Sequence, residues 1–296
     1  MSTRTPSRYS WGGDEHLVVQ VDEAMSLEAN FSVMAIAQVL QRRALDGVVD
    51  ICPANASFMV RFDPDVLAPA ELETQVRDAE QEVGDAPSLT LQTRIVEVPV
   101  WYDDPFTNET AARFRTHHQR QEGGDLEFAA LENGLSSAQE FIDRHSGSPW
   151  LTSMVGFVAG LPFLFQMVPR ERQMQVPKYL RPRTDTPALT IGHGGCFACI
   201  YSVRGAGGYQ MFGITPVPIF DPAQQLADFS EFMVFFRPGD IVKFRAIDQQ
   251  EYDRTRGEVE AGTYRYLQRP VSFSLDDFLA APDAYNATLL EVLHGH

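Results

Sequence analysis

The sequence predicts an α+β protein with two domains, and three observations lead to this prediction. The chain has 296 residues, which is long enough for two hydrophobic cores of ordinary size. Up to about residue 93, apolar residues follow the order strand, helix, strand, strand, helix, strand. Beyond residue 150, short apolar runs alternate with glycine and proline, a pattern typical of a β-barrel or sandwich.

The first domain is predicted over residues 12–93. In "EHLVVQV", Leu17 and Val19 alternate with polar residues, as do Phe58 and Val60 in "SFMVRFD", so each segment indicates a strand with one buried face. "SLEANFSVMAIAQVLQRR" and "APAELETQVRDAEQEVG" are amphipathic helices, and "SLTLQTRIVEVPV" supplies the last strand. The order β-α-β-β-α-β predicts a ferredoxin-like domain, an antiparallel sheet with both helices on one face. The first eleven residues are expected to be loose.

The second domain is predicted over residues 94–252. Two helical segments come first, and strands such as "TSMVGFVAGLPFLF", "CFACIYSV" and "GGYQMFGITPVPIF" follow them. This pattern predicts a β-barrel. Residues 253–296 contain "EYDRTRGEVEAG" and "SLDDFLAAPDAYNATLLEVL", which are predicted to be helices that pack on the outside of the barrel.

Composition excludes several classes of function. The net charge of −16 repels phosphate backbones and anionic lipid, so neither nucleic acid nor a membrane is an expected partner. Lysine occurs only at Lys178 and Lys243, and no phosphate-binding GxxxxGK[ST] loop occurs. The sequence has neither a secretory signal nor an apolar run long enough for a membrane span. With only three cysteines, it fits a reducing compartment, and a cytoplasmic location is expected.

The segment His193-Gly-Gly-Cys-Phe-Ala-Cys199 could be a ligand cluster, a reactive thiol site or part of a buried strand. Thiolate and imidazole are ligands of zinc, but a structural zinc site needs four ligands, and the remaining cysteine, Cys52, lies in the first domain. Residues three apart on a strand point to opposite faces, so Cys196 and Cys199 would converge only across a turn. The buried strand is the favoured interpretation, and the roles of both cysteines stay open.

Other polar residues have ordinary structural interpretations. Asp103 and Asp104 are adjacent, and adjacent side chains seldom converge on one atom, so a solvated turn is expected. His117 and His118 lie in an arginine-rich helical segment and are expected to be exposed. The glycines of "VRGAGGYQMFG" indicate either a turn or a backbone that lies close to a ligand.

The order of these motifs resembles the family of allophanate hydrolase subunit 1, also called the B subunit of 5-oxoprolinase, which recurs as subdomains C and D of carboxyltransferases. The resemblance runs from Gly13 to Ile247. It rests on "GGDEHLVVQV", "GVVDICPANASFMVRFDP", "VEVPVWYDDPF", "GLSSAQEFIDRHS", "MVGFVAGLPFLF", "RPRTDTPA", "GGYQMFGITPVPIFDP" and "FFRPGDIVKF". It implies a ferredoxin-like domain followed by a cyclophilin-like β-barrel. It also implies that ATP, or biotin in carboxyltransferases, is bound by partner subunits and that this chain binds no cofactor.

The chain departs from that family in the region expected to form the pocket. Where relatives have the polar pair Gln-Thr followed by glycine, this sequence has Phe197-Ala198 followed by Cys199. Ala206 and Tyr209 replace the proline and tryptophan of the family's Pro-Gly-Gly-Trp, and Ile214 replaces the arginine of Gly-Arg-Thr. Losing these donors predicts either a changed substrate or lost catalysis.

The leading hypothesis is a non-autonomous subunit of a heteromeric ATP-dependent amide or lactam hydrolase of the 5-oxoprolinase or allophanate hydrolase type. The expected partner is an amidohydrolase or carboxyltransferase-type subunit, and the expected ligand is a small amide or carboxylate. The alternatives are a subunit of a biotin-dependent, urea carboxylase-like carboxyltransferase, or an inactive regulatory protein that resembles a kinase inhibitor. No catalytic residue and no metal ligand are assigned. The predicted substrate-binding residues are Phe157, Arg183, His193, Gly207, Gly208, Tyr209 and Thr215, with Arg181 as the fallback for the anion contact of Arg183.

Overall fold

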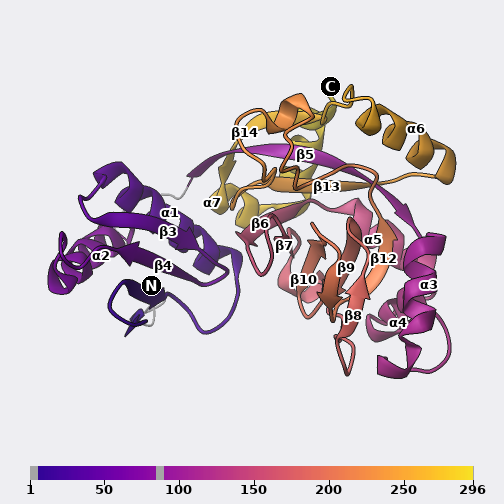
Figure 1. Ribbon diagram of the computed structural model, residues 1–296, viewed down its shortest axis with the longest axis horizontal. Helices are drawn as coiled ribbons and strands as arrows, with labels where there is room; N and C mark the ends of the chain where they lie inside the picture. Colours follow the sequence, from indigo (N-terminus) through magenta and orange to yellow (C-terminus); the bar gives the residue numbers. More distant parts are fainter. Residues whose placement is uncertain (1–5, 85–89, 296) are drawn as a thin grey trace. The chain divides into compact units, whose positions relative to one another are not determined.

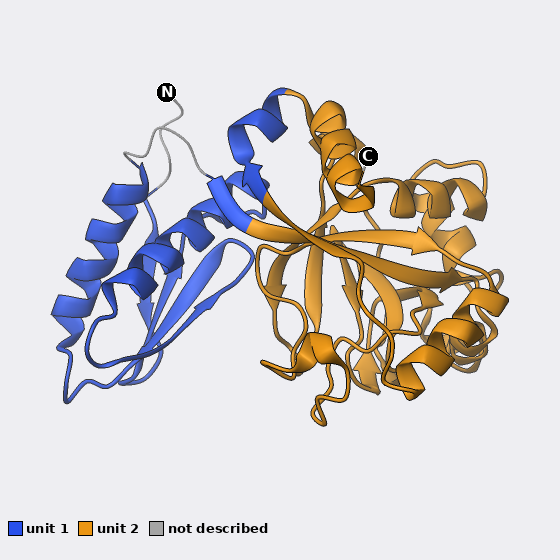
Figure 2. Ribbon diagram, turned by 90° about the horizontal axis from the view of Figure 1, so that it is seen from above, with its two compact units in different colours: residues 1–92, 272–280 blue, residues 93–271, 281–296 orange. Residues whose placement is uncertain are grey.

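The computed structural model describes residues 6–84 and 90–295 (Figure 1). The chain divides into two compact units (Figure 2). Unit 1 comprises residues 1–92 and 272–280, and unit 2 comprises residues 93–271 and 281–296. Both are mixtures of helices and sheets, as the sequence predicts; the names ferredoxin-like and cyclophilin-like stay predictions.

Unit 1 contains one antiparallel sheet in the order β1-β2-β4-β3, with helices α1 and α2 side by side on one face (Figure 2). Its elements are β1 (Arg8–Trp11), β2 (His16–Gln20), α1 (Leu27–Arg43), β3 (Val48–Pro53), β4 (Ser57–Phe62), α2 (Pro69–Gly84) and α7 (Leu275–Ala280). Leu17 and Val19 of β2 and Phe58 and Val60 of β4 point into the core under the helices. The alternation seen in the sequence is therefore confirmed.

The edge of this sheet differs from the expectation. The sequence predicts that "SLTLQTRIVEVPV" supplies the last strand of the first domain, but β5 (Thr90–Tyr102) belongs to a different sheet. Strand β1, in the part expected to be loose, pairs with β2 instead, from Arg8 opposite Gln20 to Trp11 opposite Leu17. The continuous apolar run of β5 is the physical reason, because a strand buried on both faces fits a larger sheet better than an edge.

Unit 2 is built on a larger sheet. The strands of this sheet are β5, β6 (Trp150–Val155), β7 (Pro162–Gln166), β9 (Thr190–Gly194), β10 (Phe197–Ile200), β12 (Gln210–Ile214), β13 (Ile241–Ala246) and β14 (Gln268–Ser274). A separate two-stranded sheet pairs β8 (Arg183–Thr186) with β11 (Gly205–Gly207). The helices of unit 2 are α3 (Pro105–Arg113), α4 (Asp125–Glu132), α5 (Ala138–Gly147), α6 (Gln249–Glu260) and α8 (Pro282–His294), with single 3₁₀ turns at Arg115–His117, Arg170–Arg172 and Ala227–Phe229.

The pairings of the large sheet close into a ring. The order is β12-β9-β10-β7-β6-β13-β5-β14, and a further pairing joins β12 back to β5. Gly213 lies opposite Tyr102 at this closure, and a Cβ at Gly213 would clash with the backbone oxygen of Trp101 and lie 2.9 Å from the Cα of Tyr102. Backbone atoms cannot move aside as a side chain can, so the closure requires glycine at this position.

The C-terminal segment contains a strand that the sequence does not predict. Residues 253–296 are predicted to be helices packed on the barrel, and α6 and α8 are helices of unit 2. Between them, however, β14 joins the edge of the large sheet beside β5, and α7 belongs to unit 1. None of the helices in the described ranges is both long and apolar enough to cross a bilayer.

Two histidines lie in the aromatic core of unit 2. His145 of α5 and His193 of β9 are fully buried, with ring centroids 6.1 Å apart, and Trp150 and Phe212 flank both. Nδ1 of His145 is 2.8 Å from the hydroxyl oxygen of Tyr102. Burial lowers the pKa of His193 to about 4 and the pKa of His145 well below its usual value. Both imidazoles are therefore neutral at pH 7.

The substitution Gly213→Ala is expected to lower the free energy of unfolding by about 2–4 kcal/mol. The new Cβ would clash with backbone atoms of Trp101 and Tyr102, which have no room to move. Gly257→Ala in the last turn of α6 is the matched control. A Cβ there meets nothing within 4 Å, so the variant is expected to be neutral or up to about 1 kcal/mol more stable. Urea denaturation measures both. An equally small effect at both positions would contradict the role given to Gly213.

Acid is expected to weaken the fold through His193. Its folded pKa of about 4 lies below the usual 6.5, so the unfolded chain binds more protons between these pH values and stability falls as pH falls through this window. The loss attributable to His193 is roughly 3 kcal/mol. His193→Phe keeps an apolar ring and is expected to lose that part of the pH dependence. Urea denaturation at pH 7.5 and pH 4.5 gives the free energy of unfolding of both proteins. An equal loss of stability at pH 4.5 in the two proteins would contradict the role given to His193.

Candidate functional site

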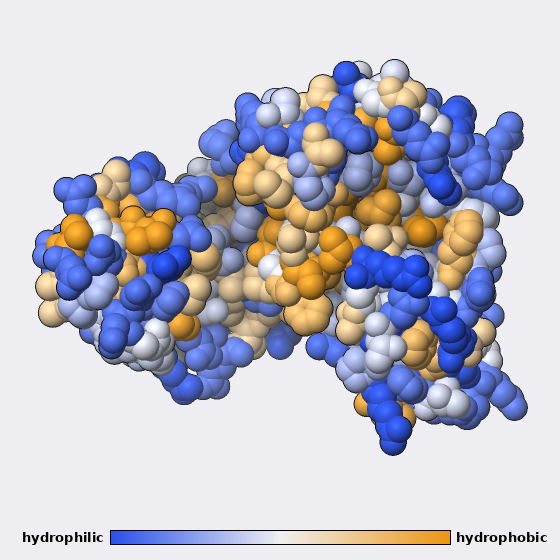
Figure 3. All heavy atoms as spheres, viewed as in Figure 1, coloured by the Kyte–Doolittle hydropathy of each residue, from blue (hydrophilic) through white to orange (hydrophobic). Residues whose placement is uncertain are grey.

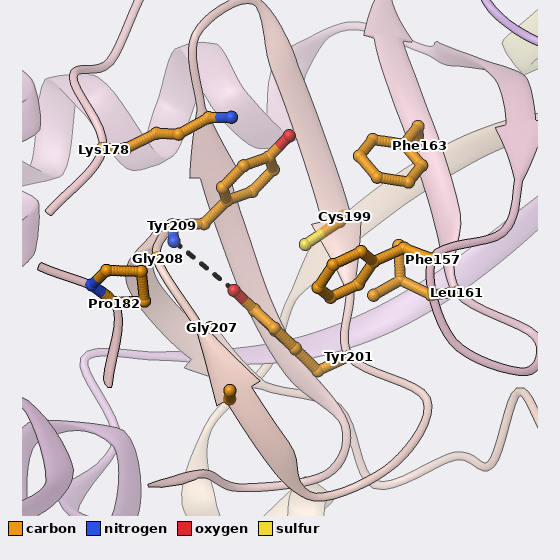
Figure 4. A pocket seen from close by; sticks show the side chains of 11 residues that line it. Phe157, Leu161, Phe163, Lys178, Pro182, Cys199, Tyr201, Gly207, Gly208 and Tyr209 are labelled. Atoms are coloured by element: carbon orange, nitrogen blue, oxygen red, sulfur yellow. Dashed lines mark hydrogen bonds between the residues drawn. The ribbon is translucent and has the colours of Figure 1, made fainter. Parts of the chain in front are cut away.

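The candidate site is an open cavity of about 410 Å³ on unit 2, a size typical of small-molecule pockets (Figure 4). It lies where the β6–β7 loop, β10 and the segment around β11 meet. Apolar side chains gather over the β6, β7 and β10 region on the face shown in Figure 3. The cavity is lined by Phe157, Leu161, Phe163, Lys178, Pro182, Cys199, Tyr201, Ala206, Gly207, Gly208 and Tyr209.

A second hollow of unit 2 is larger, about 720 Å³, and lies beside α5 and α8. Its two arginines already have carboxylate partners, since Arg144 pairs with Glu140 and Arg172 with Asp283. It offers mostly neutralised charge and no aromatic wall. The smaller cavity is therefore the better candidate for a specific ligand.

Side chains along β10 and at Tyr201, which follows it, point alternately into the main core of unit 2 and toward the cavity. Ala198 and Ile200 pack in the main core of unit 2, whereas Cys199 and Tyr201 pack in a separate cluster at the cavity. Ala198 pairs with His193 of β9, and Cys199 pairs with Gly192. Since paired residues share a face of a sheet, His193 points into the core and Cys199 points the opposite way.

The two tyrosines of the cavity lie on glycines. A Cβ at Gly207 would be 2.5 Å from the Tyr201 hydroxyl oxygen, and one at Gly192 would be 2.9 Å from the same ring. A Cβ at Gly194 would clash with the ring of Tyr209. The close approach that Gly207 allows is thus made by Tyr201, while Gly208 has open space toward the cavity, with Pro182 at 3.9 Å.

Phe157 stands at the mouth of the cavity on the loop between β6 and β7. Its φ of 70° is a left-handed conformation that is unfavourable for a bulky side chain, and its ring is 75% exposed. A strained backbone that holds a large apolar ring in water is a pattern typical of ligand-binding loops. Leu161 and Phe163 extend the same apolar wall into the cavity (Figure 4).

Polar groups occupy the side of the cavity opposite this wall (Figure 4). The Lys178 ammonium lies 5.1 Å from the centre of the Tyr209 ring, a cation–π contact. Lys178 forms no ion pair, and the Tyr209 hydroxyl no hydrogen bond, with any residue that the structure describes. Deeper in the cavity, the Tyr209 backbone N–H donates to the Tyr201 hydroxyl at 3.4 Å.

The titratable groups of the cavity are neutral at pH 7, apart from Lys178. Burial raises the pKa of Cys199, and it raises the pKa of Tyr201 and of Tyr209 as well. Cys196 also has a raised pKa because of burial. Neither thiol has the lowered pKa of a reactive cysteine. Cys199 is buried in β10, as the buried-strand interpretation expects, whereas Cys196 is half-buried in the turn between β9 and β10.

The structure brings four of the predicted site residues together: Phe157, Gly207, Gly208 and Tyr209 all line the cavity. The other three do not line it. His193 points into the core, and Thr215, also fully buried, donates its N–H to the backbone oxygen of Leu189. Arg183 is fully buried in β8, opposite Gly207 of β11.

The Arg183 guanidinium is held behind the cavity. It lies 4.4 Å from the centre of the Tyr179 ring, and its Nε donates to the Thr186 hydroxyl at 3.3 Å. Its two terminal nitrogens have no hydrogen-bond partner within residues 6–84 and 90–295. The fallback residue, Arg181, is exposed and does not line the cavity either.

A buried polar network beside Arg183 has no signal in the sequence. Asp125 at the start of α4 accepts hydrogen bonds from the Tyr179 hydroxyl at 2.8 Å and from the Met211 N–H at 2.9 Å, and it pairs with Arg115 at 3.1 Å. His118 is buried, 2.9 Å from Oε1 of Gln210, and burial lowers its pKa. The expectation that His118 is exposed is wrong, because its partners come from β12, far along the chain.

Asp104 is also buried, contrary to the solvated turn expected for it. Its carboxylate caps α3 by accepting the N–H groups of Phe106 and Thr107 at 2.9 Å each. This is a structural role. Among the described residues, no group of three or more His, Cys, Asp or Glu side chains is placed to hold a metal ion, and His193 and Cys199 lie on opposite faces of their hairpin.

The cavity can bind a ligand but offers no acid–base pair for chemistry. In the described part of the chain, no Asp, Glu or His side chain lines it. Its tyrosines and Cys199 are held neutral by burial, which leaves Lys178 as the charged group. An apolar wall and a single cation are suited to recognition of an anion that carries an apolar body.

Comparison with known proteins identifies a family match and several relatives. The family described as "Carboxyltransferase domain, subdomain C and D" matches residues 7–229. The chain is 29% identical over 255 residues to the B subunit of 5-oxoprolinase from Bacillus subtilis (strain 168), a match that covers 83% of this chain and 95% of that protein. It is 24% identical to urea amidolyase of Saccharomyces cerevisiae, over 92% of this chain but 15% of that enzyme.

A solved structure shows the same fold. The urea carboxylase of Kluyveromyces lactis superposes with a TM-score of 0.83 at 20% identity, over 99% of this chain and 26% of that one. This chain therefore spans about a quarter of that enzyme.

The family match covers most of the chain, including the strands that build the cavity as far as β12. The resemblance inferred from the order of the motifs is confirmed. The chain belongs to the family of carboxyltransferase domains, subdomains C and D.

Proposed function

We propose that this chain is a non-autonomous subunit of a heteromeric ATP-dependent amide or lactam hydrolase of the 5-oxoprolinase type, and that its cavity forms part of the substrate pocket. The similarity to the B subunit of 5-oxoprolinase, which extends over 95% of that protein, supports this proposal. ATP would be bound by a partner subunit, and this chain would bind the amide. A cytoplasmic location belongs to the same proposal.

The cavity itself carries the proposal. Hydrolysis of an amide requires an activated nucleophile, usually with a general base, and a donor that protonates the leaving nitrogen. In the described residues around the cavity, no carboxylate or imidazole is available for these roles, and burial keeps the tyrosines and Cys199 protonated. This lack supports a binding subunit, whose reacting groups we expect to come from a partner chain.

Two alternative functions are compatible with the same cavity. A subunit of a biotin-dependent carboxyltransferase is supported by the 24% identity to yeast urea amidolyase, and biotin would then be carried by a partner. A regulatory protein without catalysis is favoured by the same lack of acid–base groups at the cavity, as far as the structure describes its lining. The identity of the partner distinguishes all three functions.

Reconstitution tests the proposal. The chain is purified from its native host together with the subunits that bind it, and each subunit is also prepared alone. We expect ATP-dependent hydrolysis of 5-oxoproline or another small amide by the complex, measured as released amino acid and phosphate, and none by this chain alone. Carboxyl transfer from a biotin-bearing partner, or stable binding to a kinase without hydrolase activity, would contradict the proposal in favour of the corresponding alternative.

Two glycines of β11, Gly205 and Gly207, provide a matched pair for testing the pocket. Gly207→Ala places a methyl group 2.5 Å from the Tyr201 hydroxyl oxygen and is expected to displace that ring, raising the KM of the complex about tenfold. Gly205 does not line the cavity and a Cβ there meets no atom within 4 Å, so Gly205→Ala is expected to change KM less than about threefold. Steady-state kinetics measures KM, and urea denaturation checks that both proteins are folded. Equal KM values for the two variants would place the substrate elsewhere.

A further inference from the structure

The apolar wall of the cavity is larger than a small polar lactam requires. Phe157, Leu161 and Phe163 present two rings and a branched side chain to the same space, and Phe157 is held there at 75% exposure by an unfavourable backbone conformation. An exposed ring in water is stabilised when an apolar group covers it. A ligand consisting only of a lactam ring and a carboxylate would leave much of this wall in contact with water.

The opposite side of the cavity carries the groups that would bind an anion. The Lys178 ammonium and the Tyr209 hydroxyl lie on that side (Figure 4), and neither has an ionic or hydrogen-bonding partner in the described chain. With no carboxylate along the described lining, the site attracts a negative charge. The buried Arg183 lies nearby without lining the cavity, so it adds positive potential and no direct contact.

Three of the residues that line the cavity, Cys199, Ala206 and Tyr209, occupy positions at which the sequence departs from the family it resembles. Cys199 lies at the centre of the cavity, between Tyr201 and the apolar wall (Figure 4). Phe197, another departure, packs edge-on against Phe163, with 6.0 Å between ring centres, and so adds apolar surface beside the wall without lining the cavity.

We infer that the cavity selects an acidic amide that carries an apolar group about the size of a phenyl ring. The apolar group lies against Phe157, Leu161 and Phe163, and the carboxylate lies beside Lys178 and the Tyr209 hydroxyl. This inference rests on the proposed function for the amide itself, and it names the substrate class of the same site.

Three matched probes test this selectivity: N-(phenylacetyl)glycine, N-acetylglycine, which lacks the ring, and N-(phenylacetyl)glycinamide, which lacks the charge. Their affinities for the purified full-length chain are measured by titration calorimetry or ligand-observed NMR, and their inhibition constants are measured on the complex. We expect the first probe to bind about tenfold or more tightly than the second, because the ring is buried. We expect it to bind up to about fivefold more tightly than the third, the contribution of a partly exposed ion pair.

Two variants with controls assign the selectivity to the residues named. Phe157→Ala is expected to reduce the preference for the ring to less than about threefold, whereas Leu180→Ala, which removes an equally exposed side chain outside the cavity, leaves it unchanged. Lys178→Met is expected to abolish the preference for the charged probe. Arg254→Met, on the exposed face of α6, is the control for loss of a surface cation.

Equal binding of N-acetylglycine and N-(phenylacetyl)glycine would overturn the inference, as would a preference for the ring that survives Phe157→Ala. Either result leaves the proposed function standing if the complex still hydrolyses a small lactam with ATP. Conversely, selective binding of the acidic phenyl probe by a chain whose complexes hydrolyse no amide would refute the proposed function and support the selectivity of the cavity.

Discussion

The ring of strands in unit 2 depends on one contact, the approach of Gly213 in β12 to the backbone of Trp101 and Tyr102 in β5. Because a ring has no free edge at that point, every strand between them is held in register on both sides. The β9–β10 hairpin is one of these strand pairs, and it carries the core histidine on one face and the floor of the cavity on the other. The geometry of the candidate site is therefore fixed by a closure that lies outside it.

The floor of the cavity is a second case of close packing onto backbone. The rings of Tyr201 and Tyr209 lie on Gly192, Gly207 and Gly194, where any side chain would force them aside. Burial also holds their hydroxyl groups, and the Cys199 thiol, in the neutral form. The result is a rigid recognition surface with little capacity for proton transfer, which is consistent with the role of a binding subunit proposed above.

Sequence patterns predict features that depend on one helix or strand, such as its buried face. They do not predict features that depend on contacts between elements far apart in the chain. Alternation locates the buried faces of β2 and β4, and the order of the motifs identifies the family. The patterns cannot show that β5 leaves the first sheet for the second, because a continuous apolar run gives no information on which sheet will bury it. Nor can they reveal that His118 meets Gln210, since that hydrogen bond joins residues 92 positions apart. Within the candidate site, Phe157, Gly207, Gly208 and Tyr209 are predicted from the sequence, and Cys199 falls in the region expected to form the pocket, whereas Lys178 and Tyr201 are found only from the structure.

The two-faced character of β10 has a consequence for how this protein can change over evolution. Ala198 and Ile200 belong to the core, and Cys199 and Tyr201 belong to the cavity, so residues next to each other in sequence are under separate physical constraints. A new side chain at position 199 alters the shape of the cavity without disturbing the core packing beneath it. Ligand preference and stability can therefore diverge independently within a single short segment, which allows one scaffold to serve chemically different substrates.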